Sequence, residues 1–400
     1  MSQILVINKN NRYISATVDD FDIKELNIST TGKEDISFNL GDIIVGRVEN
    51  VVKNISSCFV EIFPGIKAYL ALSEKMPLIY TNGKQGGMPV QNDLILVQIK
   101  KEPTKTKSYF LTTDITLMNR YVVLKPFMDK VHISKKFDNS KTVTGADKKA
   151  LLDVAGEFKN TTGCGSIIRT NAAGVSADRI KSSLEELYAT YIKAVNLGVH
   201  GVKYQRVYKD IPDYLIPLRD GYEDIEKIQT DDKDAYAEIQ EYLAENDPES
   251  LDKLFLYEDE MIGLDALYSI STTIEKALKT NVWLKSGGYI VIEMTEAMTV
   301  IDVNSGGAIK GKNSSEETFL KVNKEACVTI AKELRLRNIS GIIIVDFIDM
   351  PKYMEEELVR TMQEELNHDS TQSTVIDMTG LGLMEITRRR TGKPLHEALK

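Results

Sequence analysis

Short apolar runs separated by turn residues fill the segment between residues 40 and 100. Apolar and polar positions alternate within these runs, which is typical of strands with one face in a core. This spacing favours a small barrel of the OB type. We expect its strands near residues 41–52, 57–62, 65–70 and 92–100, with further strand-like runs between 108 and 136.

Helical spacing appears in the rest of the chain. Ile180, Leu184 and Leu187 repeat at intervals of three and four residues, which predicts an amphipathic helix over residues 176–195. A capping-box sequence at residues 314–317 predicts the start of a helix that ends near residue 336. Further helices are expected over residues 231–257, with a break at Asp247-Pro248, and over residues 355–366.

Two apolar runs, one on either side of the helix expected at 314–336, carry acids near their ends. Asp302 lies in residues 289–304, and Asp346 ends residues 341–346. We interpret both runs as buried strands, in which a carboxylate without a positive partner would be costly. Two carboxylates and the amide oxygen of Asn304 suit Mg²⁺, which prefers oxygen ligands and retains waters. This pattern favours metal-assisted phosphoryl chemistry. The alternative is that the acids only cap turns.

Composition describes an ordinary globular chain. Its 400 residues allow two to four domains, with 42% hydrophobic and 27% charged residues. The net charge of −9 argues against nucleic acid, but the charge is uneven. Acids concentrate in residues 219–263, and bases in residues 100–107, 125–136 and 388–390. Local patches of this kind, rather than the net sum, determine what a surface attracts.

Cys58, Cys164 and Cys327 lie far apart in sequence, and the four histidines are scattered. We therefore expect inert thiols in a reducing cytoplasm, and no closed zinc site. Apolar runs reach only about five residues, so no membrane-spanning segment is expected. The first residues lack a basic region and a long apolar stretch, so they do not predict a signal peptide.

Several longer segments of the chain carry a recognisable pattern. They are SGGYIVI (286–292), TEAMTVIDVN (295–304), LRLRNISGIIIVDFIDM (334–350), IRT (168–170) and GLGLMEITR (380–388). These segments resemble the ribonuclease E/G endoribonucleases, and the resemblance spans nearly the whole chain.

The resemblance implies roles for three residues of the catalytic region. Asp302 and Asp346 would bind catalytic Mg²⁺, and Asn304 would hydrogen-bond the scissile phosphate. Asp349 would either cap a turn or orient the metal ligands.

The resemblance also implies an S1-like RNA-binding domain. Phe59 and Tyr69 match its base-stacking aromatics and Lys107 its basic contact; stacking on an aromatic ring tolerates any base sequence. From the residues alone, Phe59 could equally belong to the barrel core, and Lys107 could be a solvated loop charge.

A pocket for a 5′-monophosphate on RNA is implied at Arg169 and Thr170, where a guanidinium and a hydroxyl can both donate to phosphate. The alternative is an ordinary surface pair. The family commonly has two arginines where this chain has Lys135 and Lys136. Lysine keeps the charge but loses the planar fork, so we expect weaker sensing of the 5′ end.

By resemblance the fold is multi-domain α/β. Residues 1–35 and 205–280 would form a ribonuclease-H-like subdomain. An S1-like OB barrel (36–118) and a 5′-sensor region (119–204) would be inserted within it, and a DNase-I-like catalytic domain (281–400) would follow.

The expected activity is Mg²⁺-dependent cleavage of single-stranded RNA, leaving 5′-phosphate and 3′-hydroxyl ends, in rRNA processing or mRNA decay. The alternative is a catalytically inactive protein that binds RNA through its barrel. The chain lacks the Cys-containing segment that shares a zinc between protomers in the family. We therefore expect at most a loose homodimer, without a zinc link.

Overall fold

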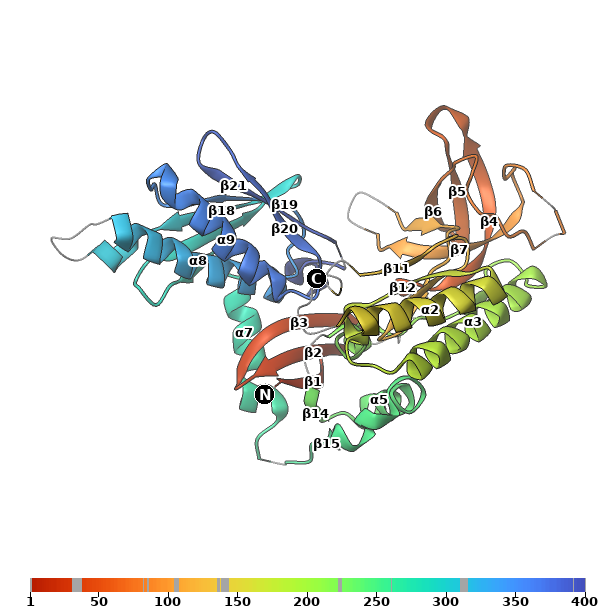
Figure 1. Cartoon of the computed structure of the whole chain (residues 1–400), viewed down its shortest axis with the longest axis horizontal. Helices are drawn as coiled ribbons and strands as arrows, with labels where there is room; N and C mark the ends of the chain where they lie inside the picture. The colour runs from red at the N-terminus through yellow and green to blue at the C-terminus, as the bar shows by residue number, and fades with distance from the viewer. Residues whose placement is uncertain are drawn as a thin grey trace. The chain divides into compact units, whose positions relative to one another are not determined.

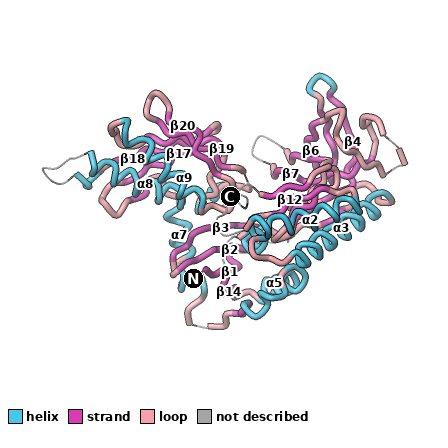
Figure 2. The backbone as a smooth tube through the Cα atoms, viewed as in Figure 1, coloured by secondary structure: helices cyan, strands magenta, loops and turns pink. Residues whose placement is uncertain are grey.

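The computed structural model describes residues 2–30, 38–81, 83–84, 86–103, 108–134, 137, 144–221, 225–259, 261–309, 316–390 and 392–399. The chain divides into two compact units. One combines Met1–Thr31 with Glu223–Lys400, and the other is the intervening stretch Gly32–Tyr222. Both units are mixed α/β structures (Figures 1 and 2).

The intervening unit contains a closed barrel of five strands, which is consistent with an OB or S1-like fold. Around the barrel the strand order is β4-β5-β6-β8-β7, and pairing of β4 with β7 closes it. Its core is formed by the inward-facing residues of these strands, such as Ile44, Val60, Leu70 and Ile95. The strands expected from the alternating pattern are confirmed: β4 (Ile43–Val52), β5 (Ser57–Phe63), β6 (Ile66–Ala71), β7 (Leu94–Lys101) and the short β8 (Phe110–Thr112).

A second sheet in this unit has the order β11-β12-β10-β9, and helices α2 and α3 pack against it. The expected helix from residue 176 is confirmed as α3, which Ser176 caps by accepting from the backbone N–H of Arg179. The elements of this region are β9 (Leu117–Met118), β10 (Val122–Lys125), β11 (Val131–Ile133), α2 (Gly145–Thr162), β12 (Gly165–Ile168), α3 (Ala177–Val199), β13 (Arg206–Tyr208) and α4 (Ile216–Asp220). Short 3₁₀ turns lie at η1 (Lys53–Ile55), η2 (Thr170–Ala172) and η3 (Asp213–Leu215).

The other unit holds two sheets. The first has the order β15-β14-β1-β2-β3, with β1, β2 and β3 antiparallel and β14 and β15 parallel to β1. Its elements are β1 (Ser2–Lys9), β2 (Arg12–Asp19), β3 (Asp22–Thr30), β14 (Ile225–Thr230), α5 (Lys233–Asn246), η4 (Pro248–Lys253), β15 (Leu254–Leu256), α6 (Leu264–Tyr268) and α7 (Ile270–Ala277). The helix expected over 231–257 is therefore wrong at its end, because residues 254–256 pair with β14 as a strand.

The second sheet has the order β16-β17-β18-β19-β21-β20, in which only β18 and β19 are parallel neighbours. Helices α8 and α9 pack on one of its faces (Figure 1). Its elements are β16 (Asn281–Trp283), β17 (Tyr289–Met294), β18 (Met298–Asn304), η5 (Gly306–Ile309), α8 (Glu316–Leu336), β19 (Gly341–Asp346), η6 (Lys352–Met354), α9 (Glu355–Asn367), β20 (Ser373–Met378), β21 (Leu383–Arg388) and α10 (Leu395–Ala398). The end expected for the helix near residue 336 is confirmed, whereas Ser314 of the capping box lies outside the described residues.

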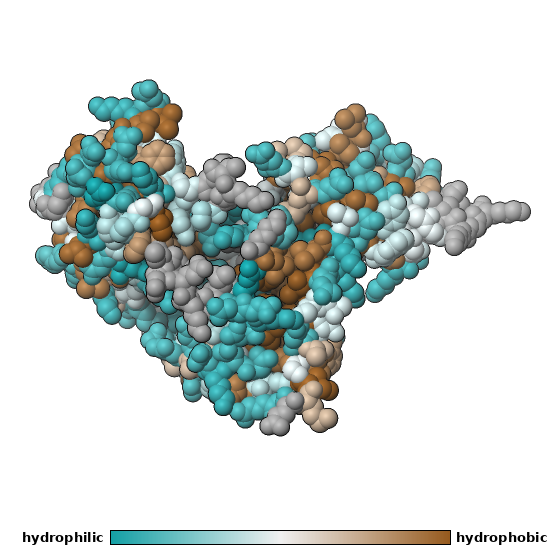
Figure 3. Space-filling model, turned by 180° about the vertical axis from the view of Figure 1, so that it is seen from behind, coloured by the Kyte–Doolittle hydropathy of each residue, from teal (hydrophilic) through white to brown (hydrophobic). Residues whose placement is uncertain are grey.

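Some large hydrophobic side chains remain exposed. On the face drawn in Figure 3 hydrophobic residues form separate patches between hydrophilic ones. Across the part of the chain that the structure describes, no helix has the length and apolar character needed to cross a membrane.

Candidate active site

Asp302 and Asp346 lie side by side on the sheet with the strand order β16-β17-β18-β19-β21-β20. They face each other directly across the parallel strands β18 and β19. Helix α8, which links these strands in sequence, packs on the opposite face together with α9. The sheet thus converts two acids 44 positions apart in sequence (346 − 302) into neighbours.

The strands are not buried on both faces, which corrects the expectation from the sequence. Along β18 exposed and buried residues alternate, with Ile301 and Val303 in the core and Asp302 exposed. Asp346 is also exposed, at the end of β19. The reason is the period of two in a strand, which sends the acids to the face opposite the helices. We call that side the open face; it carries Tyr289, Val291, Val300, Asp302, Asn304, Ile342 and Asp346.

Asn304 ends β18 on the same face as Asp302. Its side-chain Nδ2 donates a hydrogen bond of 2.6 Å to Oδ2 of Asp302. The amide is therefore held against the carboxylate pair, with its carbonyl oxygen not used in that hydrogen bond.

The charges at this site are unbalanced. Partial burial raises the pKa of Asp346, and the negative charges of Asp302 and Asp349 raise it further. Asp349 therefore lies close enough to Asp346 to add to the negative field there. A cation between the carboxylates would relieve the repulsion.

The donor set fits a hard divalent cation bound mostly by water. No group of three or more His, Cys, Asp or Glu arranged for a metal occurs in the described ranges. Two carboxylates with an adjacent amide are enough for Mg²⁺, which keeps several waters and takes one or two carboxylates from the protein.

A buried polar residue that the sequence analysis missed fixes the segment after Asp346. Asn323 of α8 is fully buried; its Nδ2 donates to the carbonyl of Ile348 at 2.9 Å, and its Oδ1 accepts from the N–H of Ile348 at 3.1 Å. Both backbone polar groups of Ile348, its N–H and its carbonyl, are thereby satisfied. The sequence did offer one indication of this residue, because the Asn323 side-chain amide falls on the apolar side of an amphipathic helix.

Gly288 allows close approach on the other side of the site. A Cβ at this position would lie 2.8 Å from the backbone oxygen of Asn304. Only glycine therefore lets the start of β17 pack against the end of β18 without displacing Asn304.

The barrel carries a row of three half-buried aromatic rings across adjacent strands. Phe59 and Tyr69 are register partners with ring centroids 6.1 Å apart, and Tyr69 lies 5.4 Å from Phe110 on β8. The ammonium of Lys101 lies 5.4 Å from the Phe110 centroid. Phe59 is half-buried and is not part of the barrel's core cluster. Lys107 lies outside the described residues.

Phe110 and Lys101 extend the two aromatics expected from the sequence. Beside Phe110 is an open pocket of about 640 Å³ whose lining includes Lys75, Lys100 and Phe127. The sequence analysis missed Phe110 and Lys101 because strand pairing brings them together. Pairing of β6 with β8 places Phe110 beside Tyr69, and pairing of β7 with β8 places Lys101 beside Phe110.

Arg169 and Thr170 lie together at the end of β12, and both have partners. The Arg169 guanidinium pairs with Asp220 at 2.9 Å and donates to the carbonyl of Asn119 at 2.7 Å. The Thr170 hydroxyl is 3.1 Å from that of Ser134. Burial alone would raise the pKa of Asp220, but Arg219 and Arg169 hold it below its ordinary value. Lys135 and Lys136 lie outside the described residues.

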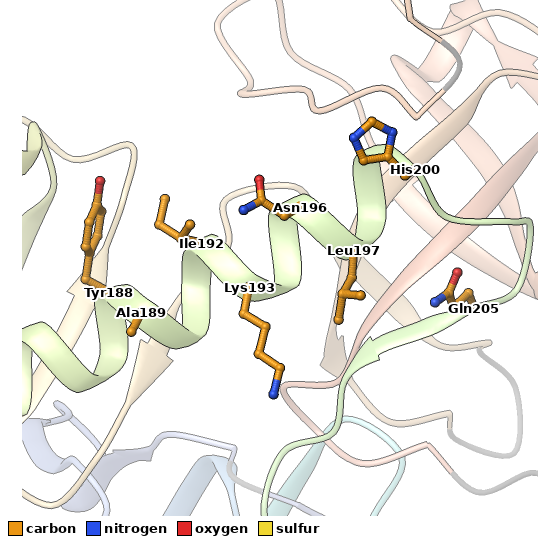
Figure 4. Close-up of a pocket in the computed structure, with 8 residues that line it drawn as sticks. All are labelled: Tyr188, Ala189, Ile192, Lys193, Asn196, Leu197, His200 and Gln205. Atoms are coloured by element: carbon orange, nitrogen blue, oxygen red, sulfur yellow. The ribbon is translucent and has the colours of Figure 1, made fainter.

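A further pocket of about 780 Å³ runs along the outer side of α3 (Figure 4). Its lining residues are Tyr188, Ala189, Ile192, Lys193, Asn196, Leu197, His200 and Gln205. None of them is a residue expected from the sequence to act in catalysis or RNA binding.

The three cysteines are free and buried. Burial raises the pKa of Cys58 to about 11 and also raises that of Cys164 and Cys327. At neutral pH all three are therefore protonated thiols with low reactivity.

Comparison with known proteins places the chain in a family. The model of the ribonuclease E/G family matches residues 116–391. The chain belongs to the ribonuclease E/G family. As a member it is an endoribonuclease, a hydrolase of phosphodiester bonds.

Relatives match along nearly the whole chain. Ribonuclease G of Haemophilus influenzae is 36% identical over 393 residues, which are 94% of this chain and 77% of that protein. Ribonuclease G of Salmonella typhimurium is 32% identical over 396 residues, covering 96% and 79%. Ribonuclease E of Synechocystis sp. is 33% identical over 382 residues, covering 94% and 55%.

Proposed function

We propose that this chain cleaves single-stranded RNA in a Mg²⁺-dependent reaction that leaves 5′-phosphate and 3′-hydroxyl ends. The observation that carries the proposal is the direct pairing of Asp302 with Asp346 on the open face. Two adjacent carboxylates repel each other unless a cation lies between them. Partial burial raises the pKa of Asp346 most, and the charge of Asp302 raises it further.

In the proposed reaction, Asp302 and Asp346 hold the cation and Asn304 contacts the scissile phosphate. Bound there, Mg²⁺ would supply positive charge to the phosphoryl oxygens and activate water for in-line attack. The hydrogen bond from Asn304 to Asp302 holds the amide at the site before substrate arrives. Asn323 fixes the backbone at Ile348, two residues after Asp346.

The aromatic row on the barrel supports binding of single-stranded RNA. Phe59, Tyr69 and Phe110 offer ring faces to successive bases, and Lys101 adds positive charge beside Phe110. We include Lys107 as a phosphate contact on the resemblance alone.

A 5′-phosphate site at Arg169 and Thr170 is also proposed, and the resemblance adds Lys135 to it. Asp220 already occupies part of the Arg169 guanidinium. An arriving phosphate must therefore share Arg169 with Asp220 or displace it, which adds to the weakening expected from the lysine pair.

We propose a ribonuclease-H-like subdomain formed by residues 1–35 and 205–280. The strand order β15-β14-β1-β2-β3 supports it. A DNase-I-like catalytic domain over 281–400 is proposed on the resemblance, together with a role in rRNA processing or mRNA decay. The loose homodimer without a zinc link stays a prediction.

The test uses single-stranded RNA with a 5′-hydroxyl and a label at its 3′ end, so that the labelled product carries the new 5′ end; it is incubated with the protein in Mg²⁺ and in EDTA. We expect internal cleavage in Mg²⁺ only, and product 5′ ends that a monophosphate-specific exonuclease can degrade. Tight binding without any cleavage would instead support the catalytically inactive RNA-binding protein.

A further inference from the structure

The single tryptophan of the chain, Trp283, lies on the open face of the sheet that carries Asp302 and Asp346. Trp283 is 70% exposed, although it is among the most hydrophobic side chains. Its ring centroid is 5.3 Å from that of Tyr289, and the ring planes meet at 53°.

Strand register connects this aromatic pair to the acids. Trp283 pairs with Tyr289, and Tyr289 pairs with Asn304, so the three form one row across β16, β17 and β18. Paired residues project to the same face of a sheet. Strand spacing places the Cα of Trp283 about 10 Å from that of Asn304.

The turn between β16 and β17 holds the pair in place. Backbone N–H groups of Lys285 and Ser286 both donate to the carboxylate of Glu325 on α8. Leu284 is buried in the core beneath the sheet. These contacts fix the turn that follows Trp283, and with it the position of Trp283 relative to Asp302 and Asp346.

We propose that Trp283 and Tyr289 form a stacking platform for a nucleobase of the RNA strand beside the scissile phosphate. This inference rests on the proposed function. The row Trp283–Tyr289–Asn304 carries no acid, unlike the neighbouring row with Asp302 and Asp346. The exposed Lys285 adds positive charge at the turn that follows Trp283, which suits the phosphate of a stacked nucleotide. A ring face accepts any base, so the platform would position the strand without selecting its sequence.

The tryptophan supplies its own probe, because all indole emission from this chain comes from Trp283. The experiment adds a single-stranded oligoribonucleotide without self-complementarity to the full chain. Ca²⁺ replaces Mg²⁺, because it also takes oxygen ligands and limits cleavage during the measurement. We expect saturable quenching with the same Kd that fluorescence anisotropy of labelled RNA gives.

Three variants complete the test. Trp283→Ala should weaken RNA binding about tenfold, and Trp283→Phe, which keeps a ring, should retain most of the affinity. Phe21→Ala is the matched control, because Phe21 is 69% exposed and lies 5.3 Å from Tyr268 in the same unit; its affinity should be unchanged.

Unchanged emission on saturation with RNA would overturn the platform while the proposed function stands. A change in sedimentation of Trp283→Ala with unchanged RNA affinity would also overturn it, and would assign the face to a second copy of the chain. Absence of both binding and cleavage by the wild type would overturn the proposed function and the platform together.

Discussion

The pKa of Asp346 depends on its burial and on the charges of neighbouring acids. Its pKa is raised by partial burial and by the charges of Asp302 and Asp349. Between the value of about 3.9 for an unfolded Asp and this raised value, the metal-free native state binds more protons than the unfolded state. Stability of the metal-free protein therefore falls as pH rises through that window. Affinity for Mg²⁺ should rise over the same window, because binding needs the ionised carboxylate.

Asp302→Asn removes one of these negative charges, so we predict a lower pKa for Asp346 in this variant. The measurement is titration of the Asp346 carboxyl carbon by NMR in metal-free protein. Asp377→Asn changes an exposed acid on β20 of the same sheet and should leave the titration unchanged. An unchanged Asp346 titration in Asp302→Asn would show that the two acids are not electrostatically coupled.

We predict that Phe59 and Phe110 contribute to RNA binding rather than to stability. Each changed to Ala should weaken binding of single-stranded RNA by ~1–3 kcal/mol, the value of one stacked base. Tm should change little, because both rings are half-buried and neither belongs to the barrel's core cluster. Phe255→Ala, at an exposed aromatic on β15, serves as the control. A sharply lower Tm with unchanged affinity per folded molecule would make Phe59 a core residue.

At the scale of elements, periodicity predicted the long regular pieces. The barrel strands follow from the alternation of apolar and polar residues, and α3 follows from apolar residues at i, i+3 and i+4 spacing. Both patterns show in the sequence because a strand or helix that buries one face repeats its apolar residues at its own period. The strand β15 was missed, since Leu254-Phe-Leu is only three residues and becomes a strand through pairing with β14. Burial of Asp302 was wrong because an apolar run does not reveal whether helices cover one face of its sheet or both.

The sequence also indicated the two acids but not what supports them. Asn323, Phe110 and Trp283 each gain their place from partners on other strands or helices. Such contacts depend on tertiary packing. A local pattern can place Asn323 on the apolar side of its helix, but it does not show which groups these side chains contact.

Asn323 links α8 to the segment after Asp346, and Asn323→Ala should loosen that link. The variant leaves the N–H and carbonyl of the half-buried Ile348 without the Asn323 partner, at a cost of up to ~1–3 kcal/mol for each group. We predict a lower Tm, and a loss of cleavage at temperatures where the variant is still fully folded. Thermal melting and single-turnover cleavage at low temperature measure the two effects.

Thr329→Val on the same helix is the control, because the Thr329 hydroxyl donates only within α8, to the carbonyl of Glu325. Full cleavage by folded Asn323→Ala would mean that the Ile348 contact serves stability alone.

At the scale of the whole molecule, the proposed 5′-phosphate site and the proposed catalytic acids belong to different compact units. Arg169→Gln should remove any preference for 5′-monophosphorylated over 5′-hydroxyl RNA, while basal cleavage of long substrates remains. Asp220→Asn should keep or increase the preference, because it frees the Arg169 guanidinium. Competition between the two RNAs measures this ratio. A wild type without any preference would show that Lys135 and Lys136 do not support sensing.

The most direct test of the central claim compares single-turnover cleavage by wild type, Asp302→Asn and Asp346→Asn in Mg²⁺, with Asp377→Asn as control. Loss of either paired carboxylate removes a ligand of the cation. We predict rates lower by about three to five orders of magnitude in both variants, with RNA binding retained and the control at the wild-type rate. Near-wild-type cleavage by Asp302→Asn or Asp346→Asn would contradict a catalytic cation held between these two acids.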